Sequence, residues 1–282
     1  MRYAVPYLFI FVFVALSALF MVAPTVTLAI QSVSGPEGFT WDYLRALGDY
    51  RYVSAFRNSI VLSAASAVVG VLSGGLIAHT VLKPGAPRGL QSAVTSFSAV
   101  AANFAGVPLA FAFVATLGSL GLLTQALKGV GFDVYAHGFS LYSITGLTIV
   151  YSYFQIPLMV IIITPALQAL KVEWREAAEN MGASDRQFWR LVGLPVLAPS
   201  ILSSFILLFG SAFSAYATAY ALTSGNISLL TTEIANVLSG DVMSSPQTGA
   251  ALAVGMIVVM VLVLGGSAVL ARRAARWQGS RR

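Results

Sequence analysis

The chain alternates between long apolar stretches and shorter polar segments. Six of the apolar stretches are long enough to cross a membrane, because a helix needs ~20 predominantly apolar residues to span the hydrocarbon core. The expected spans cover residues 5–30, 58–82, 90–117, 143–170, 198–223 and 247–271. The pattern therefore predicts an all-α, polytopic membrane helix bundle with six transmembrane helices, forming one domain over residues 1–282.

The composition agrees with an integral membrane protein. Hydrophobic residues make up 57% of the chain and charged residues 9%, whereas soluble domains carry roughly 25% charged residues. The chain has no cysteine, so disulfides, thiolate metal sites and cysteine nucleophiles are excluded. The first apolar stretch is longer than the ~7–15 apolar residues of a signal peptide. An uncleaved first helix is therefore favoured, with a cleaved signal peptide as the alternative.

Small residues and helix breakers indicate how two of the spans pack. Gly70 and Gly74 form a Gly-x-x-x-Gly motif in the second span, which permits close approach of another helix. Asn103, Gly106 and Pro108 fall near the middle of the third span. Polar and helix-breaking residues are tolerated at membrane depth where they face protein or a wet cavity. The third helix is therefore expected to face the bundle interior.

The polar connections hold little regular structure of their own. Residues 31–57 carry turn signals and aromatic side chains, which predict short helices lying at the membrane–water interface. Residues 118–142 are rich in glycine. We expect this segment to contain at most a short helix that does not cross the membrane.

One strongly charged segment, residues 171–195, lies between the fourth and fifth spans. Its first half repeats apolar side chains at i, i+3, i+4 and i+7, namely at Trp174, Ala177, Ala178 and Met181. This spacing predicts an amphipathic helix over residues 173–181. Gly182 follows and can adopt the left-handed conformation that commonly ends a helix.

The second half of the same segment predicts a second short helix. Ser184 and Gln187 have the spacing of a capping box. The apolar face of this helix consists of Phe188, Trp189 and Val192. Pro195 is expected to stop the helix, because proline lacks a backbone N–H. The segment is thus predicted to form two short helices that meet at a bend.

The segment Glu176-Ala177-Ala178, with Gly182, Val192 and Leu194-Pro195 at their observed spacings, resembles the EAA loop of the membrane subunits of bacterial ABC importers. Val192 stands where that family usually has isoleucine, which is a like-for-like apolar change. In the family this loop is the coupling helix that docks in a groove of a cytoplasmic ATPase. The alternative interpretation is an ordinary amphipathic linker between two spans.

The resemblance implies the type I ABC importer permease fold and a binding-protein-dependent transport function. It is nearest to the permeases for polyamines, ferric iron and phosphonates, with sugar permeases as the second choice. The implied partners are a cytoplasmic ABC ATPase dimer, a second permease subunit that is identical or homologous, and an extracytoplasmic solute-binding protein. ATP and magnesium belong to the ATPase, so no cofactor is expected in this chain. The implied coupling residues are Trp174, Glu176, Ala177, Ala178, Met181, Gly182, Ser184, Val192 and Pro195.

The distribution of basic residues predicts the orientation of the chain. If the chain starts inside the cell and crosses six times, 12 basic residues lie on the cytoplasmic side and 4 on the outer side, as the positive-inside rule requires. Both termini and the charged segment 171–195 are then cytoplasmic, in the inner membrane of a bacterium. The basic tail suits a surface of anionic lipid, so no nucleic-acid partner is needed.

Catalytic motifs are missing from the sequence. There is no phosphate-binding Gly-x-x-x-x-Gly-Lys-Ser/Thr loop, no Gly-x-Ser-x-Gly elbow and no His-Glu-x-x-His helix. His79 and His137 are far apart, so no metal site is expected. The span cores hold no Asp or Glu, which disfavours a secondary transporter or channel that relies on intramembrane ionisable groups. A membrane enzyme is disfavoured for the same lack of chemistry.

The resemblance places the solute path between the third to sixth spans of two permease subunits. Candidate lining residues are those that are polar at membrane depth: Asn103, Tyr153, Gln155, Ser211, Ser214, Tyr216 and Tyr220. Each has an alternative role as an interhelical hydrogen-bonding group or an interfacial aromatic residue. The missing carboxylates argue against a tight polycation site within this chain.

Overall fold

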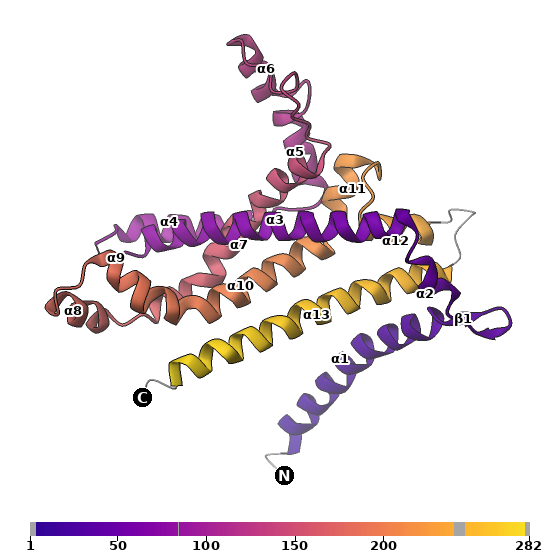
Figure 1. Ribbon diagram of the computed structural model, residues 1–282, viewed down its shortest axis with the longest axis horizontal. Coiled ribbons are helices and arrows are strands. Elements are labelled where there is room, and N and C mark those ends of the chain that lie inside the picture. The colour runs from indigo at the N-terminus through magenta and orange to yellow at the C-terminus, as the bar shows by residue number, and fades with distance from the viewer. Residues whose placement is uncertain (1–3, 84, 240–245, 280–282) are drawn as a thin grey trace. The chain divides into compact units, whose positions relative to one another are not determined.

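The computed structural model describes residues 4–83, 85–239 and 246–279. Over these residues the chain is helical apart from one short hairpin and the connecting turns (Figure 1). Six helical segments of the described chain are long and apolar enough to cross a membrane: Ile10–Gln31, Tyr50–Val81, Val107–Gly129, Ile144–Gln168, Asp185–Ser214 and Pro246–Ser267. The predicted all-α class is confirmed. Arg2, Arg281 and Arg282, which the charge argument counts, lie outside the described residues.

The chain divides into two compact units, and the first comprises Met1–Phe56 and Ser228–Val261. Its elements are α1 (Ala4–Gln31), β1 (Ser34–Gly35), β2 (Gly38–Phe39), α2 (Asp42–Ala46), the start of α3 (Tyr50–Val81), α12 (Leu230–Leu238) and the start of α13 (Pro246–Gly279). The antiparallel hairpin turns through Pro36 and Glu37, and Gly38, which starts β2 and pairs with Gly35, has φ +114°; this is the segment that carries the predicted turn signal. The pairing of β1 with β2 is a feature that the sequence did not predict.

A buried ion pair joins α3 to α12 in this unit. The Nε and Nη2 atoms of Arg51 lie 2.8 and 2.7 Å from Glu233 Oε2, and the Glu233 side chain is 4% exposed. This contact joins the first turn of α3 to α12, and α3 begins at Tyr50, before the predicted start of the span at residue 58. Loss of Arg51, whose side chain is 47% exposed, would leave the buried Glu233 carboxylate without this compensating charge.

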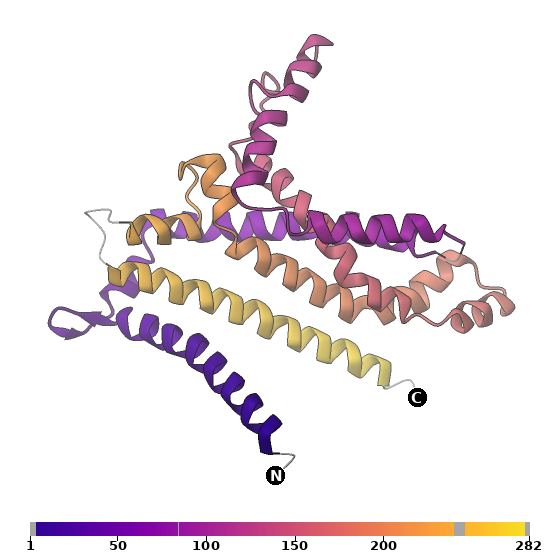
Figure 2. The ribbon, with the colours of Figure 1, turned by 180° about the vertical axis from the view of Figure 1, so that it is seen from behind.

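The second unit comprises Arg57–Ile227 and Leu262–Arg282. After α3 it contains α4 (Arg88–Ala101), α5 (Val107–Leu117), α6 (Leu122–Gly129), α7 (Ile144–Gln168), α8 (Val172–Asn180), α9 (Asp185–Phe188), the π-helical turn η1 (Trp189–Gly193), α10 (Leu194–Ser214) and α11 (Ala217–Thr223). α7 is the central helix and lies against α4 and α10 (Figures 1 and 2). Ser143 begins α7, because its Oγ accepts a hydrogen bond from Gly146 N.

Two glycines let α3 approach its neighbours closely. A Cβ on Gly70 would lie 2.6 Å from Leu208 Cδ2 of α10, and a Cβ on Gly74 would lie 2.5 Å from the Ile156 carbonyl oxygen of α7. Neither space admits a side chain without movement of its neighbours. The predicted role of the Gly-x-x-x-Gly motif in close helix packing is therefore confirmed.

The predicted third span, residues 90–117, is not one helix. α4 and α5 cover it, with non-helical chain over residues 102–106 between them. Gly106 has φ +76°, and Pro108 in the first turn of α5 has no N–H to bond back across the break. The chain turns here, and α5 and α6 extend away from α4 and α7 (Figure 1). The third apolar segment long enough to span is Val107–Gly129, which includes residues predicted not to cross.

The predicted fifth span, residues 198–223, is also broken. α10 ends at Ser214, Ala215 is extended with ψ 110°, and α11 starts at Ala217. The carbonyl of Ala215 accepts a hydrogen bond from Tyr151 Oη at 3.0 Å instead of continuing the helical ladder. The broken ends of the third and fifth predicted spans meet, since Gly106 N donates to Thr218 Oγ1 at 2.8 Å.

Candidate functional site

The bend between α8 and α9 has the geometry that the sequence predicts. Gly182 has φ +79°. Its N–H donates to the Glu179 carbonyl at 2.9 Å, and the Ala183 N–H donates to the Ala178 carbonyl at 3.0 Å. This pair of bonds is a complete Schellman motif, which satisfies the last carbonyls of α8 while it reverses the chain.

The capping box that begins α9 is also present. Ser184 Oγ accepts from Gln187 N at 3.3 Å, and Gln187 Oε1 accepts from Ser184 N at 2.7 Å. The two bonds satisfy donors at both ends of the box and fix the angle at which the chain enters α9. These two motifs give the backbone of the bend a defined shape.

The prediction that Pro195 ends the second helix is wrong. α9 continues through η1 directly into α10, where Pro195 occupies the first turn. In η1 the Leu194 N–H donates to the Trp189 carbonyl, five residues earlier. This wider π-helical turn accommodates a residue without an N–H. The second half of the segment is therefore rigidly continuous with the span that follows it.

Arg175 fastens α8 to α9, which the sequence analysis missed. Its Nε lies 3.1 Å from Glu179 Oε1 on the same helix, and its Nη2 lies 3.0 Å from Asp185 Oδ1 at the start of α9. The i,i+4 spacing of Arg175 and Glu179 was a visible signal. The contact between Arg175 and Asp185 has no such signal in the sequence, because it depends on the angle of the bend.

The exposed face of α8 differs from the predicted one. Ala178 is only 6% exposed, because this small residue allows α8 to lie against α9. Trp174 is 40% and Met181 80% exposed. Glu176 and Ala177 are also exposed, and Glu176 lies about 200° around the helix from Ala178. The face open to a partner is therefore centred on Glu176 and Ala177, with Ala178 turned inward.

The remaining predicted coupling residues lie on the same structure. Gly182 and Ser184 form the bend, Val192 is half-buried in η1, and Pro195 is exposed in α10. α8 and α9 lie at one end of α7 and α10, whereas α5, α6 and α11 lie toward the other end (Figures 1 and 2). The bent pair is thus a protrusion at one end of the second unit.

Gln155, a predicted path residue, is fully buried in the second unit. Its side chain is 0% exposed, and its Nε2 donates to Ser66 Oγ at 3.2 Å and to the Leu208 carbonyl at 3.1 Å. The residue therefore ties α7 to α3 and α10. This arrangement favours the alternative role of an interhelical hydrogen-bonding group.

The other predicted path residues are accessible to different degrees. Tyr153 is exposed, and its ring contacts Phe104 and Phe113 at centroid distances of 6.2 and 5.9 Å. Tyr216 and Tyr220 stack at 5.2 Å at the start of α11. The polar aliphatic candidates are exposed or half-buried: Asn103, Ser211 and Ser214.

Two of these polar side chains form hydrogen bonds with backbone carbonyls four residues earlier in the chain. Asn103 Nδ2 donates to the Ala99 carbonyl, and Ser214 Oγ donates to the Gly210 carbonyl. The accessible aromatic groups at the two helix breaks are therefore the strongest remaining candidates for contact with solute. The sequence could not show that the breaks lie together.

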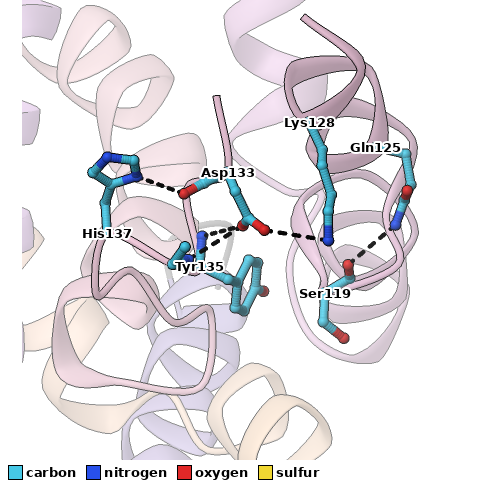
Figure 3. Close-up of polar contacts among 7 residues, drawn as sticks. Ser119, Gln125, Lys128, Asp133, Tyr135 and His137 are labelled. Atoms are coloured by element: carbon cyan, nitrogen blue, oxygen red, sulfur yellow. Dashed lines mark hydrogen bonds and ion pairs between the residues drawn. The ribbon is translucent and has the colours of Figure 1, made fainter. Parts of the chain in front are cut away.

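The connection after α6 is ordered by Asp133 (Figure 3). Its carboxylate lies 3.2 Å from Lys128 Nζ and accepts from the N–H groups of Tyr135 and Ala136. The Ala136 N–H, and then the Lys128 ammonium group, lower the pKa of Asp133 below its ordinary value. His137 Nδ1 lies 2.7 Å from the Asp133 carbonyl oxygen.

We expect acid to loosen this connection. A carboxyl group whose pKa is lowered in the folded state adds stability above its unfolded pKa, about 3.9, and this contribution disappears as the pH falls through the folded pKa. Hydrogen exchange at the amides of Tyr135 and Ala136, corrected for intrinsic rates, should therefore accelerate in acid. In Asp133→Ala, which has no side-chain acceptor, the exchange should be fast at all pH values. An unchanged pH profile in this variant would contradict the assignment.

Comparison with known proteins identifies the family. The sequence profile of the family described as binding-protein-dependent transport system inner membrane component matches residues 130–276. This is more than half of the chain. The chain belongs to this family. The matched region contains α7, the α8–α9 bend and α10, so the predicted EAA loop lies within the part shared with the family's other members.

One curated relative and several solved structures are similar to this permease-family chain. A spermidine/putrescine transport system permease protein PotC homologue of Mycoplasma genitalium is 29% identical over 112 residues, which is 40% of this chain and 37% of the relative. The match thus spans well under half the length of that relative. A structure of a bacterial ABC transporter involved in the import of the acidic polysaccharide alginate has a TM-score of 0.76, with 18% identity over 96% of each chain.

A second structural relative extends the comparison to another importer. An inward-facing methionine ABC transporter, MetNI, has a TM-score of 0.58 with 14% identity, covering 79% of this chain and 95% of that chain. At these identities the structural similarity concerns the fold. It confirms the ABC importer permease fold that the resemblance implied.

Proposed function

We propose that this chain is a transmembrane subunit of an ATP-driven, binding-protein-dependent importer, and that it forms half of a solute path. The α8–α9 bend would couple it to a cytoplasmic ATPase, where ATP and magnesium are bound. The observation that supports this proposal most strongly is the bent helix pair, rigidly continuous with α10 and exposed around Glu176 and Ala177. The partners are an ATPase dimer, a second permease subunit and an extracytoplasmic solute-binding protein.

The coupling mechanism follows from the continuity of the chain. Motion of a docked ATPase would press on α8. The Schellman bend, the Arg175–Asp185 ion pair and the η1 turn would pass this displacement to α10. No flexible linker separates α9 from α10. A movement of the bend would therefore tilt α10, because no flexible segment can take up the displacement. The α10–α11 break would then move relative to Tyr151 and Gly106, which hydrogen-bond to it.

The accessible aromatic rings at the helix breaks are the proposed solute contacts. Tyr153, Tyr216 and Tyr220 present ring faces and hydroxyl groups. Such groups can hold a cation by cation–π attraction or lie against a sugar ring. The PotC homologue supports a small polar solute of the polyamine class. The alginate importers, related in fold, keep a sugar-like solute as the alternative.

Charge reversal at Glu176 tests the coupling role. Glu176→Lys should weaken binding of the cognate ATPase roughly 30-fold or more, since loss of one member of a desolvated charge pair costs ~2 kcal/mol or more. Membrane insertion should be unchanged, because Glu176 is exposed. The measurement is co-purification of the ATPase with the chain, followed by import into proteoliposomes.

The matched control for this test is Glu37→Lys. Glu37 is also exposed, lies in the hairpin turn of the first unit, and undergoes the same change of charge. It should retain ATPase binding and import. Normal import by Glu176→Lys would contradict the coupling role, and equal loss in both variants would show a general effect of added charge.

A further inference from the structure

A basic cavity lies beside the coupling bend in the second unit. Its volume is about 220 Å³, and its lining comes from the ends of α3 and α7 and from α8, α9 and η1. The charged and titratable lining residues are His79, Lys83, Lys171 and Arg175. Among the described residues that line the cavity there is no Asp or Glu. We call it the basic pocket.

Two donors in the basic pocket are available for an anion. Lys83 and Lys171 are exposed, and no ion pair is recorded for either among the described residues. Trp189 also lines the cavity. Its ring packs against His79 and Phe188 at centroid distances of 4.4 and 5.9 Å, and its Nε1 is shut off from solvent, so the two lysines are the donors that an anion can reach.

The start of α8 adds to the positive potential of the pocket. Lys171 and Val172 line the cavity, so the N-terminal end of this nine-residue helix, with its partial positive charge, lies at the cavity. Glu173 follows in the same turn but is not a lining residue. Arg175 already bonds Glu179 and Asp185, which leaves the two lysines as the main uncompensated charges.

The other lining groups suit the glycerol and upper acyl region of a lipid. Leu82, Leu167, Leu170 and Val172 are apolar and surround the cationic groups. The pocket lies where α3 and α7 end, at the depth of lipid headgroups if these helices cross the bilayer. Basic pockets between helices on the cytoplasmic side are suited to anionic headgroups.

We propose that the basic pocket binds the phosphate group of an anionic phospholipid of the cytoplasmic leaflet. Lys83 and Lys171 supply the positive charge that holds the phosphate group. The lipid would brace α8 against the ends of α3 and α7, beside the bend. The proposal rests on the proposed function only for the orientation that makes this end of the chain cytoplasmic.

The test uses the full-length chain in phosphatidylcholine nanodiscs with increasing phosphatidylglycerol, and counts bound phosphatidylglycerol by native mass spectrometry. The variant is Lys83→Gln with Lys171→Gln. A cation near an anionic surface contributes ~1 kcal/mol, or about fivefold in affinity. The double variant should therefore lose roughly 25-fold in affinity for phosphatidylglycerol. Lys83→Arg with Lys171→Arg should retain it.

The matched control is Arg186→Gln with Arg190→Gln. Both arginines are exposed on the same segment but do not line the pocket, so this variant removes the same charge and should keep phosphatidylglycerol binding. Equal loss in both double variants would overturn the proposal, because attraction would then be unspecific. Retained binding in the pocket variant would also overturn it.

Competition with inorganic phosphate tests whether the pocket binds the phosphate group of a lipid or a soluble phosphate ion. Millimolar inorganic phosphate should not displace phosphatidylglycerol, since it lacks the apolar part that Leu82 and Leu167 contact. Displacement that depends on Lys83 and Lys171 would assign the pocket to a soluble anion and overturn the lipid proposal. ATPase co-purification, measured in parallel, reports on the coupling function separately: if it persists while lipid binding is absent, only the pocket proposal fails.

Discussion

Gly182→Val is expected to uncouple ATP hydrolysis from import. Gly182 has φ +79°, and a non-glycine residue held in the left-handed region costs ~1–2 kcal/mol. A Cβ at this position would meet nothing within 4 Å, so the penalty comes from the backbone alone. It should lower the population of the native bend about fivefold to thirtyfold relative to straightened alternatives.

The measurement for Gly182→Val is solute-stimulated ATP hydrolysis and import in proteoliposomes that contain the complete transporter. Stimulation and import should both fall, while the amount of inserted chain stays the same. Gly182→Asn is the matched control, because asparagine tolerates the left-handed conformation better than other side chains, and it should retain most of the activity. Equal activity of the valine and asparagine variants would contradict the role of the bend.

Gly74→Ala is expected to destabilise the second unit by ~1–3 kcal/mol, the usual cost of overpacking a close contact. The new Cβ would lie 2.5 Å from the Ile156 carbonyl oxygen and 2.7 Å from Met159 Cβ. Since backbone is one of the obstacles, α3 and α7 must separate. The free energy of unfolding can be followed by titrating the purified chain from a mild detergent into a denaturing one.

The next residue supplies the control for this prediction. A Cβ on Gly75 would meet only Met159 Cε, at 3.7 Å, which is an ordinary contact. Gly75→Ala should therefore leave the free energy of unfolding unchanged or raise it by up to ~1 kcal/mol, because alanine is the better helix former. Equal destabilisation by both substitutions would show that the α3–α7 contact is looser than the structure has it.

Local interactions explain which parts of the chain the sequence predicts well. The backbone turn is formed by Gly182 and the Ser184–Gln187 capping box, all close in sequence, and both motifs form as predicted. The Gly70–Gly74 motif is likewise a local pattern. It predicts a close helix contact without specifying which helix is the partner, and the structure has such a contact at both glycines. Motifs that depend on residues close in sequence therefore form as predicted within the complete fold.

Long-range contacts explain what the sequence does not predict. Asn103, Gly106 and Pro108 marked a disturbance in the third span, but nothing local showed that Gly106 would bond Thr218 of another broken span. The inward orientation of Ala178 depends on the angle between α8 and α9, which Arg175 and Asp185 stabilise across the bend. In each case the deciding partner is remote or across a turn.

The continuation of α9 into α10 contradicts a prediction that was based on a local signal. Pro195 is a strong local signal for a helix end, and the structure accommodates it through a π-helical turn over Trp189–Gly193. Gly193 is required in this turn, because a Cβ there would lie 2.6 Å from the Trp189 ring. The pairing of a glycine with a large aromatic residue four positions earlier was the available sign that the turn is wider than an α-helical one.

The most direct test of the account is the location of the bend relative to the membrane and the ATPase. The chain has no cysteine, so a single Met181→Cys substitution provides a unique thiol at a position that is 80% exposed. Val130→Cys, at a position that is 80% exposed directly after α6, is the control for the opposite side. A membrane-impermeant thiol reagent is applied to right-side-out and inverted vesicles, with and without the cognate ATPase.

We predict that Met181→Cys reacts only in inverted vesicles, is protected when the ATPase is bound, and forms a cross-link to the ATPase with a short thiol-reactive linker. Val130→Cys should react only in right-side-out vesicles, and bound ATPase should not change its reactivity. Labelling of Met181→Cys from outside the cell, or full reactivity and no cross-link in the assembled transporter, would contradict the account.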